Sequence, residues 1–308
     1  MDEFELIRRY FVRDENAPDV ICGIGDDGAV VQTGADTELV IVVDTLIEGV
    51  HFPAGTDASD IGYRAVAVNL SDIAAMGARP RWMTLALTIA SADVAWMKSF
   101  ADGLHTAATE HDVQLVGGDM TRGDCCVVTV QINGEVDTGC AIQRAGASVG
   151  DTIFVTGYLG DAAAGLERLS QGHRDDYLAG RFLRPTARVE YGRSLAGTAS
   201  AAIDLSDGLY ADLQKMLTAS GVGAEIDLHS LPISKALQTH FDRDEQRRFA
   251  LSGGDDYELC FTAAHGRLPD AREVRVTAIG TVTDSQRIVC LDQGVVVPFD
   301  DSGYRHFQ

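Results

Sequence analysis

The segment that most limits the fold runs from Ala65 to Met76 and reads AVAVNLSDIAAM. It is small and apolar on nearly every face of a helix, so most sides of this helix must be buried. Asn69 and Asp72 lie three residues apart and therefore share a face. A buried carboxylate is costly unless it is paired or coordinates a metal ion. The chain must therefore enclose this helix in a large core and also provide a partner for Asp72.

Two explanations of Asp72 remain open at this point. No Lys or Arg lies at helical spacing to pair with it, because Arg64 is eight residues earlier and Arg79 lies beyond the end of the helix. A bound metal ion is one explanation. A helix cap or an ion pair with a distant arginine is the other.

The rest of the chain predicts a mixed α+β protein with two domains. Its 308 residues exceed the usual size of one domain. Strands and helices follow one another without the strict repeat of a doubly wound sheet. A new unit is expected near Ala147, which gives domains at residues 1–147 and 148–308. The expected helices are 3–11, 60–76, 91–111 with Ser91 as N-cap, 161–169 and 209–219, and the expected strands are 38–43, 82–90, 113–116, 126–135, 152–156, 199–203, 257–262, 274–282 and 288–291.

The charge balance excludes several kinds of partner. With 25 basic and 46 acidic residues the net charge is -21, which repels nucleic-acid backbones and anionic membranes. No apolar run reaches the ~18 residues of a membrane helix, and the acidic start of the chain does not resemble a signal peptide. The six cysteines form no CxxC pair, which is typical of reduced thiols. We expect a cytoplasmic protein without nucleic-acid or membrane partners.

Part of the acidic excess lies at strand ends and tight turns, where binding residues are commonly mounted. These aspartates are Asp26, Asp27, Asp44, Asp119, Asp204, Asp207, Asp255 and Asp256. They predict a hard cation with oxygen ligands, and Mg²⁺ suits them because it takes one or two carboxylates plus substrate phosphates and water. A chain this acidic can hold a polyphosphate only if cations bridge the like charges. A solvated acidic surface accounts for many of the other carboxylates.

The common nucleotide-binding motifs do not occur in the sequence. It contains neither a GxxxxGKS/T loop nor a GxGxxG turn after a strand, and it lacks the protein-kinase set of Lys, HRD and DFG. Two short echoes, GIGDDGAV with SGGDDYEL and VNLSDIAAMG with IDLSDGLYAD, are compatible with two related halves.

Longer motifs along the whole chain resemble the thiamine-monophosphate kinase family. They are residues 23–27 (GIGDD), 44–45 (DT), 48–52 (EGVHF), 68–77 (VNLSDIAAMG), 117–123 (GGDMTRG), 155–157 (VTG), 203–209 (IDLSDGL) and 251–259 (LSGGDDYEL). The resemblance implies transfer of the ATP γ-phosphoryl group to thiamine monophosphate, giving thiamine diphosphate and ADP, with several Mg²⁺ ions.

The same resemblance implies a fold and an assembly. The fold is a two-domain, aminoimidazole ribonucleotide synthetase-like α+β arrangement. Its N-terminal domain would bind ATP and Mg²⁺ and pair into a β-barrel across a homodimer, and its C-terminal domain would complete the active site. We expect direct in-line displacement without a general base or covalent intermediate, because the attacking phosphate oxygen is already ionised.

Residue roles follow from the resemblance by motif position. Asp27, Asp44, Asp72, Asp119, Asp204 and Asp207 would hold the magnesium ions, Gly118, Asp119, Arg144 and Ser206 would contact ATP, and His51, Asp255 and Tyr304 would lie near the thiamine phosphate. Asp207 and Arg144 would support the transfer, Arg144 by bracing phosphate oxygens. Without the resemblance, Arg144 reads equally well as a surface arginine at a domain junction.

Two positions depart from the family pattern. Val42 and Val43 precede Asp44 where Ser or Thr is common, so a metal contact there would use a main-chain carbonyl. Asp255 stands where Glu is usual and is one methylene shorter. The alternatives are another ATP-dependent enzyme of the superfamily, such as an aminoimidazole ribonucleotide synthetase, or a non-catalytic acidic binder of nucleotides or cations.

Overall fold

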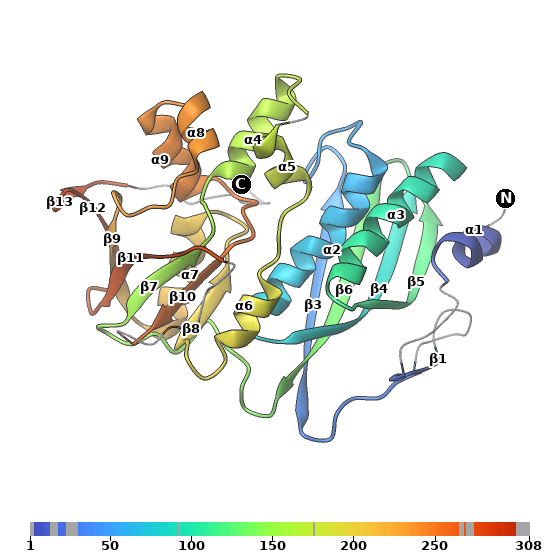
Figure 1. Cartoon of the computed structure of the whole chain (residues 1–308), viewed down its shortest axis with the longest axis horizontal. Coiled ribbons are helices and arrows are strands. Elements are labelled where there is room, and N and C mark those ends of the chain that lie inside the picture. The colour runs from blue at the N-terminus through green and yellow to red at the C-terminus, as the bar shows by residue number, and fades with distance from the viewer. Residues whose placement is uncertain are drawn as a thin grey trace. The chain divides into compact units, whose positions relative to one another are not determined.

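Two separate main β-sheets, one in each half of the chain, organise the structure (Figure 1). The computed structural model describes residues 3–12, 18–22, 30–91, 93–174, 176–264, 268 and 274–299. The chain divides into a first unit of Met1–Ile73 and Ala78–Gly139 and a second unit of Ala74–Gly77 and Cys140–Gln308. The expected two-part α+β architecture is confirmed. In the part of the chain described, no helix has the length and apolar character needed to cross a bilayer.

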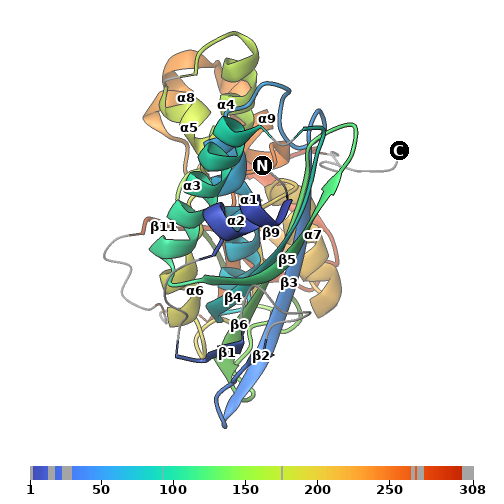
Figure 2. The same cartoon turned by 90° about the vertical axis from the view of Figure 1, so that its right-hand side faces the viewer.

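The first unit is built on a four-stranded sheet covered on one face by helices. Its elements are α1 (Glu3–Tyr10), β1 (Val20–Cys22), β2 (Val30–Val31), β3 (Thr37–Ile47), α2 (Ala58–Ala75), β4 (Arg79–Ile89), α3 (Val94–Glu110), β5 (Gln114–Arg122) and β6 (Val127–Asp137). The sheet order is β3-β6-β4-β5, and β1 with β2 forms a separate ribbon. Val128, Val130 and Ile132 of β6 are fully buried on the face that α2 and α3 cover (Figure 2). Strands β4 and β5 are parallel because α3 connects them.

Helices α2 and α3 approach each other closely because glycines stand at their contact. A Cβ atom at Gly103 would lie 1.8 Å from the Ser59 carbonyl oxygen, and one at Gly62 would lie 2.2 Å from the Phe100 carbonyl oxygen. Phe100 and Leu104 are completely buried beside these glycines. The contact holds α2, which carries Asp72, firmly in its unit.

Replacing Gly103 by alanine is expected to destabilise the first unit by about 1–3 kcal/mol, the range for overpacking a tight interior. The clashing atoms belong to the backbone of α2, so they cannot rotate away. Thermal unfolding monitored by circular dichroism measures the change. Gly180→Ala is the matched control, because the Cβ there meets nothing within 4 Å; it is expected to be neutral or stabilising by up to about 1 kcal/mol. Equal melting of both variants would contradict the tight contact.

The opposite face of the first sheet carries an apolar stripe at its edge. Leu39, Ile41 and Val43 of β3 are 46%, 59% and 60% exposed. Beside them the hydroxyls of Thr45 and Thr129 lie 2.9 Å apart in a hydrogen bond. Strands β3 and β5 are the two edges of this sheet, so each has one side open for pairing.

The second unit contains a seven-stranded mixed sheet in the order β13-β12-β9-β11-β7-β10-β8. Its elements are β7 (Thr152–Thr156), α4 (Asp161–Ser170), α5 (Tyr177–Leu183), α6 (Val189–Ser194), β8 (Ala201–Asp204), α7 (Leu209–Ser220), β9 (Gly223–Asp227), α8 (Lys235–His240), α9 (Arg243–Ser252), β10 (Leu259–Ala263), β11 (Val276–Thr283), β12 (Ile288–Asp292) and β13 (Val295–Val297). Leu213, Met216 and Leu217 of α7 belong to the same core cluster as Ile203 and Cys260 of the sheet. This packing fixes the turn between β8 and α7.

The start of α3 differs from the expectation. The helix begins after Asp93 and not at Ser91, because the Asp93 carboxylate accepts hydrogen bonds from the N–H groups of Ala95 (2.7 Å) and Trp96 (3.0 Å). Aspartate and serine are both favoured N-cap residues, so the sequence alone does not show which of the two caps the helix. The hydrogen bonds of the first turn do.

Two strands extend further than their apolar patterns indicate. Strand β3 continues to Ile47, so Asp44 lies inside the strand and not at its end. Strand β5 likewise runs to Arg122 and includes Asp119. Both strands are extended by ladder hydrogen bonds to a neighbouring strand, which a local hydrophobicity pattern does not reveal.

Candidate functional site

In the first unit the sheet register separates two of the predicted metal ligands. Asp44 of β3 pairs with Val130 of β6, Val130 pairs with Leu85 of β4, and Leu85 pairs with Gly118 of β5. Asp119 follows Gly118 in β5, so Asp44 and Asp119 lie on opposite edge strands of the sheet. With about 4.8 Å between neighbouring strands, three steps amount to about 14 Å. Two ligands of one Mg²⁺ ion lie within about 4 Å of each other, so a single sheet does not bring these two carboxylates to one ion.

Helix α2 presents Asn69 and Asp72 as expected, but their burial differs from the expectation. Asn69 is fully buried; its Nδ2 donates to the Ala65 carbonyl (2.9 Å), and its Oδ1 has no hydrogen-bond partner within the described part of the chain. Asp72 is partly exposed, so the expectation of an enclosed carboxylate is wrong. The core covers nearly all of residues 65–76 and leaves this side chain at its margin, where an ion can reach it.

A tight turn after β3 presents His51. The N–H of Ile47 donates to His51 Nδ1 (3.0 Å), and the N–H of His51 donates to the Ile47 carbonyl (2.9 Å). A neutral imidazole that accepts at Nδ1 carries its proton on Nε2. The half-buried ring is therefore oriented as a hydrogen-bond donor, which suits an oxyanion.

In the second unit, the turn between β8 and α7 brings three predicted residues together. Asp204 is the last residue of β8 and is 4% exposed, and Ser206 and Asp207 follow it at partly exposed positions. Asp207 Oδ2 lies 2.5 Å from Lys215 Nζ. Burial lowers the pKa of Lys215, but hydrogen bonds to Asp207 and Asp212 outweigh this effect and the pKa is raised. Asp207 is therefore held beside a stable positive charge.

A second turn, just before β10, lies directly against the first. The N–H of Asp255 donates to the Ser206 carbonyl and the N–H of Tyr257 donates to the Leu205 carbonyl, both at 2.9 Å. Asp255 and Tyr257 have φ of 71° and 50°, a left-handed conformation that costs about 1–2 kcal/mol per non-glycine residue. The Tyr257 hydroxyl donates to Asp255 Oδ1 (3.3 Å). Ser206 and Asp255 are thus brought together from segments about 50 residues apart.

The neighbouring Asp256 anchors this turn from the interior of the unit. It is 2% exposed, and its carboxylate accepts from the N–H groups of Gly160 (2.6 Å) and Ala162 (3.1 Å) at the start of α4. Burial raises the pKa of Asp256 to about 8, although these hydrogen bonds act in the opposite direction. The two adjacent aspartates therefore have different surroundings.

A buried ionic cluster beneath this turn was missed by the sequence analysis. Glu258 is completely buried and accepts from Arg181 (2.9 Å), from Arg188 through two nitrogens (2.6 Å each) and from the Thr156 hydroxyl (2.7 Å). The only signal in the sequence is a glutamate between Tyr257 and Leu259 in an apolar run. Its partners stand 70, 77 and 102 residues away, so no local pattern predicts them.

The remaining predicted residues are distributed as follows. Arg144 is exposed, and its carbonyl accepts from the Ser220 hydroxyl (3.2 Å). A Cβ atom at Gly118 would lie 2.0 Å from the Leu85 carbonyl oxygen, so the sheet itself requires a glycine there. Asp27 and Tyr304 lie outside the described residues.

The donors fit magnesium only with help from a ligand. Within the described ranges, no group of three or more His, Cys, Asp or Glu side chains is placed to hold a metal ion. The predicted residues offer carboxylate, hydroxyl and carbonyl oxygens, which suit Mg²⁺. Phosphate oxygens and water would have to complete the coordination, which is the usual mode for Mg²⁺ bound together with nucleotides.

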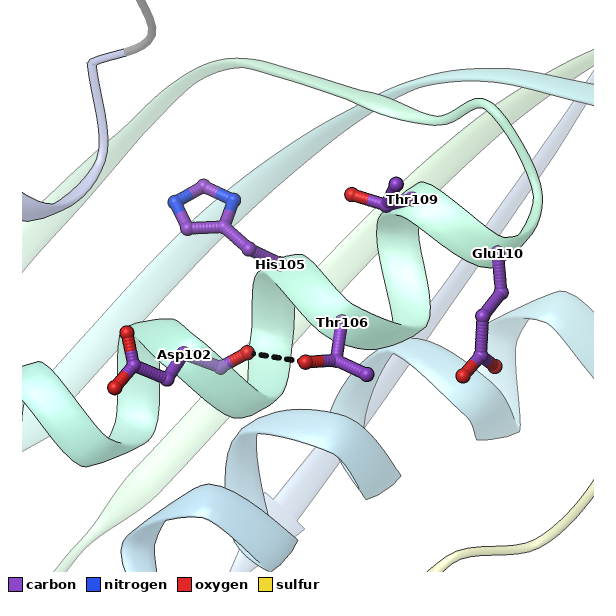
Figure 3. Close-up of a pocket in the computed structure, with 5 residues that line it drawn as sticks. All are labelled: Asp102, His105, Thr106, Thr109 and Glu110. Atoms are coloured by element: carbon purple, nitrogen blue, oxygen red, sulfur yellow. Dashed lines mark hydrogen bonds between the residues drawn. The ribbon is translucent and has the colours of Figure 1, made fainter.

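A shallow hollow on α3 lies apart from these residues. Asp102, His105, Thr106, Thr109 and Glu110 line it, all on one helix, and the Thr106 hydroxyl donates to the Asp102 carbonyl (2.7 Å, Figure 3). None of the predicted metal, ATP or substrate residues lines it. This hollow is therefore not a candidate active site.

Known proteins resemble the chain over nearly its whole length. Residues 25–136 match the AIR synthase related protein, N-terminal domain, and residues 148–293 match the corresponding C-terminal domain. The two sheets and these matches define a two-domain protein of the AIR synthase related class. The thiamine-monophosphate kinase of Salmonella typhimurium is 46% identical over 319 residues, covering 99% of this chain and 98% of that protein. The chain belongs to the thiamine-monophosphate kinase family.

Solved structures agree with this assignment. The crystal structure of thiamine-monophosphate kinase from Stenotrophomonas maltophilia K279a has a TM-score of 0.83 and 45% identity, covering 89% of this chain and 91% of that chain. The structure of AaThiL complexed with AMPPCP and TMP has a TM-score of 0.80 and 33% identity, covering 92% of both chains. The resemblance drawn from the sequence motifs is confirmed.

Proposed function

We propose that the chain transfers the γ-phosphoryl group of ATP to thiamine monophosphate, giving thiamine diphosphate and ADP. One observation carries this proposal: kinases of that name match almost the entire chain, and one relative has been solved with AMPPCP and TMP. The motif residues support it, because the turns at 204–208 and 253–258 bring Ser206, Asp207 and Asp255 into one polar patch. A purely structural acidic protein would have no need for this strained arrangement.

The proposed metal ligands are Asp27, Asp44, Asp72, Asp119, Asp204 and Asp207. Bound Mg²⁺ ions would neutralise phosphate charge and polarise the transferred phosphoryl group. This is a strong requirement here, since the chain carries a net charge of -21. Gly118, Asp119, Arg144 and Ser206 would hold ATP, Arg144 by donating to phosphate oxygens from its exposed side chain.

The acceptor side of the site would orient thiamine monophosphate for in-line attack. His51 donates from Nε2 to a phosphate oxygen, while Asp255 and Tyr304 lie near the thiamine part. The attacking atom is a phosphate oxygen that is ionised at neutral pH, so no side chain has to remove a proton. The residues bind and align the two phosphates, and no covalent enzyme intermediate forms.

The proposed assembly is a homodimer in which two four-stranded sheets close into one β-barrel. Each copy offers open edges at β3 and β5, and the apolar stripe of Leu39, Ile41 and Val43 would be covered by the partner. Pairing β5 of one copy with β3 of the other would put Asp119 and Asp44 of the partner subunit on adjacent strands. The two residues would then be one strand apart instead of the three strand steps, about 14 Å, within one sheet.

The remaining aspects of the proposal concern organisation and location. An N-terminal ATP-binding and dimerisation domain would span residues 1–147, and a C-terminal domain at 148–308 would complete the active site. The absence of CxxC pairs supports a cytoplasmic location, and the acidic surface argues against nucleic-acid partners.

Purified protein with ATP, Mg²⁺ and thiamine monophosphate is expected to form thiamine diphosphate and ADP in equal amounts. EDTA is expected to abolish the reaction and excess Mg²⁺ to restore it, because phosphate charge must be bridged by cations. Chromatographic separation of the thiamine phosphates measures the product. Binding of ATP without binding or turnover of thiamine monophosphate would instead indicate a related synthetase or a non-catalytic binder, and aminoimidazole ribonucleotide synthetase substrates would then be assayed.

A further inference from the structure

The start of α7 is the natural place for the chain to hold a phosphate. The sequence DLSDG leads into this 12-residue helix, and backbone N–H groups at such a position are a common anion site. In the structure, the three N–H groups just before the first helical residue, Leu209, already have an anion. Asp212 Oδ2 accepts from the N–H groups of Ser206 (3.0 Å), Asp207 (2.9 Å) and Gly208 (3.2 Å).

The Asp212 side chain is built into the unit and is not a mobile surface group. It is 1% exposed, and its second oxygen, Oδ1, accepts from Lys215 Nζ (2.8 Å). The same ammonium group lies 2.5 Å from Asp207 Oδ2. Both oxygens of Asp212 therefore have hydrogen-bond partners, and Lys215 connects Oδ1 to Asp207, a proposed metal ligand.

We propose that Asp212 is a positioning residue that shapes the turn carrying Asp204, Ser206 and Asp207, and that its carboxylate binds the N–H groups of residues 206–208, just ahead of α7, in place of a ligand phosphate. This inference rests on the proposed function for the role of the turn. Three consecutive N–H groups bound to one oxygen fix the backbone of residues 206–208. The proposed metal ligands are then oriented before any ion arrives, which lowers the cost of ordering them on binding.

A consequence is that phosphate binding at residues 206–208 depends on cations and side chains. Backbone N–H groups that donate to Asp212 are not available to ATP. Removing the negative charge of Asp212 would release them and would also free Lys215 to pair with Asp207 alone. The turn would then be less ordered and its carboxylate ligand more strongly engaged by lysine.

Hydrogen exchange of the ligand-free wild-type protein tests the first half of the proposal. The amides of Ser206, Asp207 and Gly208 are expected to be protected without Mg²⁺ or nucleotide, because their acceptor is part of the chain. Mass spectrometry with fragment-level resolution measures this. Fast exchange of these amides that becomes slow only after addition of Mg²⁺ and AMPPCP would overturn the proposal.

Asp212→Asn tests the second half. Its amide would turn an N–H group toward either the turn or Lys215, so one side loses its acceptor. Binding of Mn²⁺ in the presence of ADP, measured by electron paramagnetic resonance, is expected to weaken about tenfold or more, the usual effect of losing a residue that orients metal ligands. Asp212→Glu is expected to recover part of the affinity. Asp93→Asn is the matched control, since Asp93 also accepts two backbone N–H groups at a helix start but lies in α3.

The outcomes separate this proposal from the proposed function. Unchanged Mn²⁺ affinity in a folded Asp212→Asn protein would overturn it. If that variant does not fold, the wild-type exchange experiment decides alone. If the wild-type protein binds neither Mn²⁺ nor ADP, the proposed function fails, whereas the protection of the three amides still reports on Asp212.

Discussion

Asp72→Asn is expected to lower kcat by about 10² to 10³ while the protein stays folded, a loss comparable to removing one strong electrostatic contact from a transition state. The amide keeps the size of the side chain but not its charge. Asp72 stands at the margin of a helix that is otherwise almost entirely buried, so the core fixes the helix that carries it. The expected loss is therefore in turnover and in Mg²⁺ dependence.

Steady-state kinetics at several Mg²⁺ concentrations, together with thermal melting, measure this effect. Asp60→Asn is the matched control because Asp60 lies in the first turn of the same helix and has no proposed role. It is expected to leave kcat within about twofold, as for most surface substitutions. Wild-type kinetics in Asp72→Asn combined with a lower melting temperature would show that Asp72 is structural only.

Mixing two inactive variants is expected to restore activity if the site is shared between subunits. Asp44→Asn and Asp119→Asn homodimers should each lose about 10² or more in kcat, since each lacks one proposed metal ligand at both sites. A mixed dimer contains one site with both ligands intact and one with neither. It should therefore recover close to half of the wild-type activity, an increase of well over tenfold above either parent.

Co-expression with two different affinity tags and sequential purification isolates the mixed dimer for this measurement. The control is a mixed dimer of wild-type protein with an Asp44→Asn, Asp119→Asn double variant, which places one lost ligand in each site and should stay inactive. If this control keeps half of the activity while the first mixed dimer is dead, each site is complete within one chain. The proposed barrel pairing of β5 with β3 would then be wrong.

The parts of the fold that were predictable are those in which local pattern and tertiary packing agree. The segment from Ala65 to Met76 is apolar on nearly every face, and its helix is buried almost throughout. The helix 209–219 and the strands near 82–90 and 126–135 also match observed elements closely. In each case the hydrophobic period was long enough to identify the element without knowledge of its neighbours.

Other elements could not be predicted because their apolar residues do not recur at a clear helix or strand period. Helices α5, α6, α8 and α9 are short, between 6 and 10 residues, and several have polar sequences such as RDEQRRFALS. Strand β9 joins the sheet through pairing with β11 and β12, which lie some 50 residues or more further along the chain. Isolated helices of this length are marginal in water, so tertiary contacts determine them.

The candidate site was likewise predictable only in part. The motifs identified Asp204, Ser206, Asp207 and Asp255, and the structure joins them through the hydrogen bonds between their turns. The separation of Asp44 from Asp119 was not predictable, because it depends on the strand order and register. Asp212 was also missed, since an acid in the first turn of a helix is common and says nothing about which groups it binds.

The enclosed glutamate with its two arginines has a consequence for how this chain can change over time. Loss of Glu258 would leave Arg181 and Arg188 without their shared carboxylate, and stranding members of such a buried set costs about 3–5 kcal/mol. Glu258 lies 77 residues from Arg181 and 70 from Arg188, and replacing all three takes three separate substitutions. We expect relatives either to keep all three residues or to replace all three. The set is therefore a useful marker for recognising remote relatives whose ligand-binding aspartates have diverged.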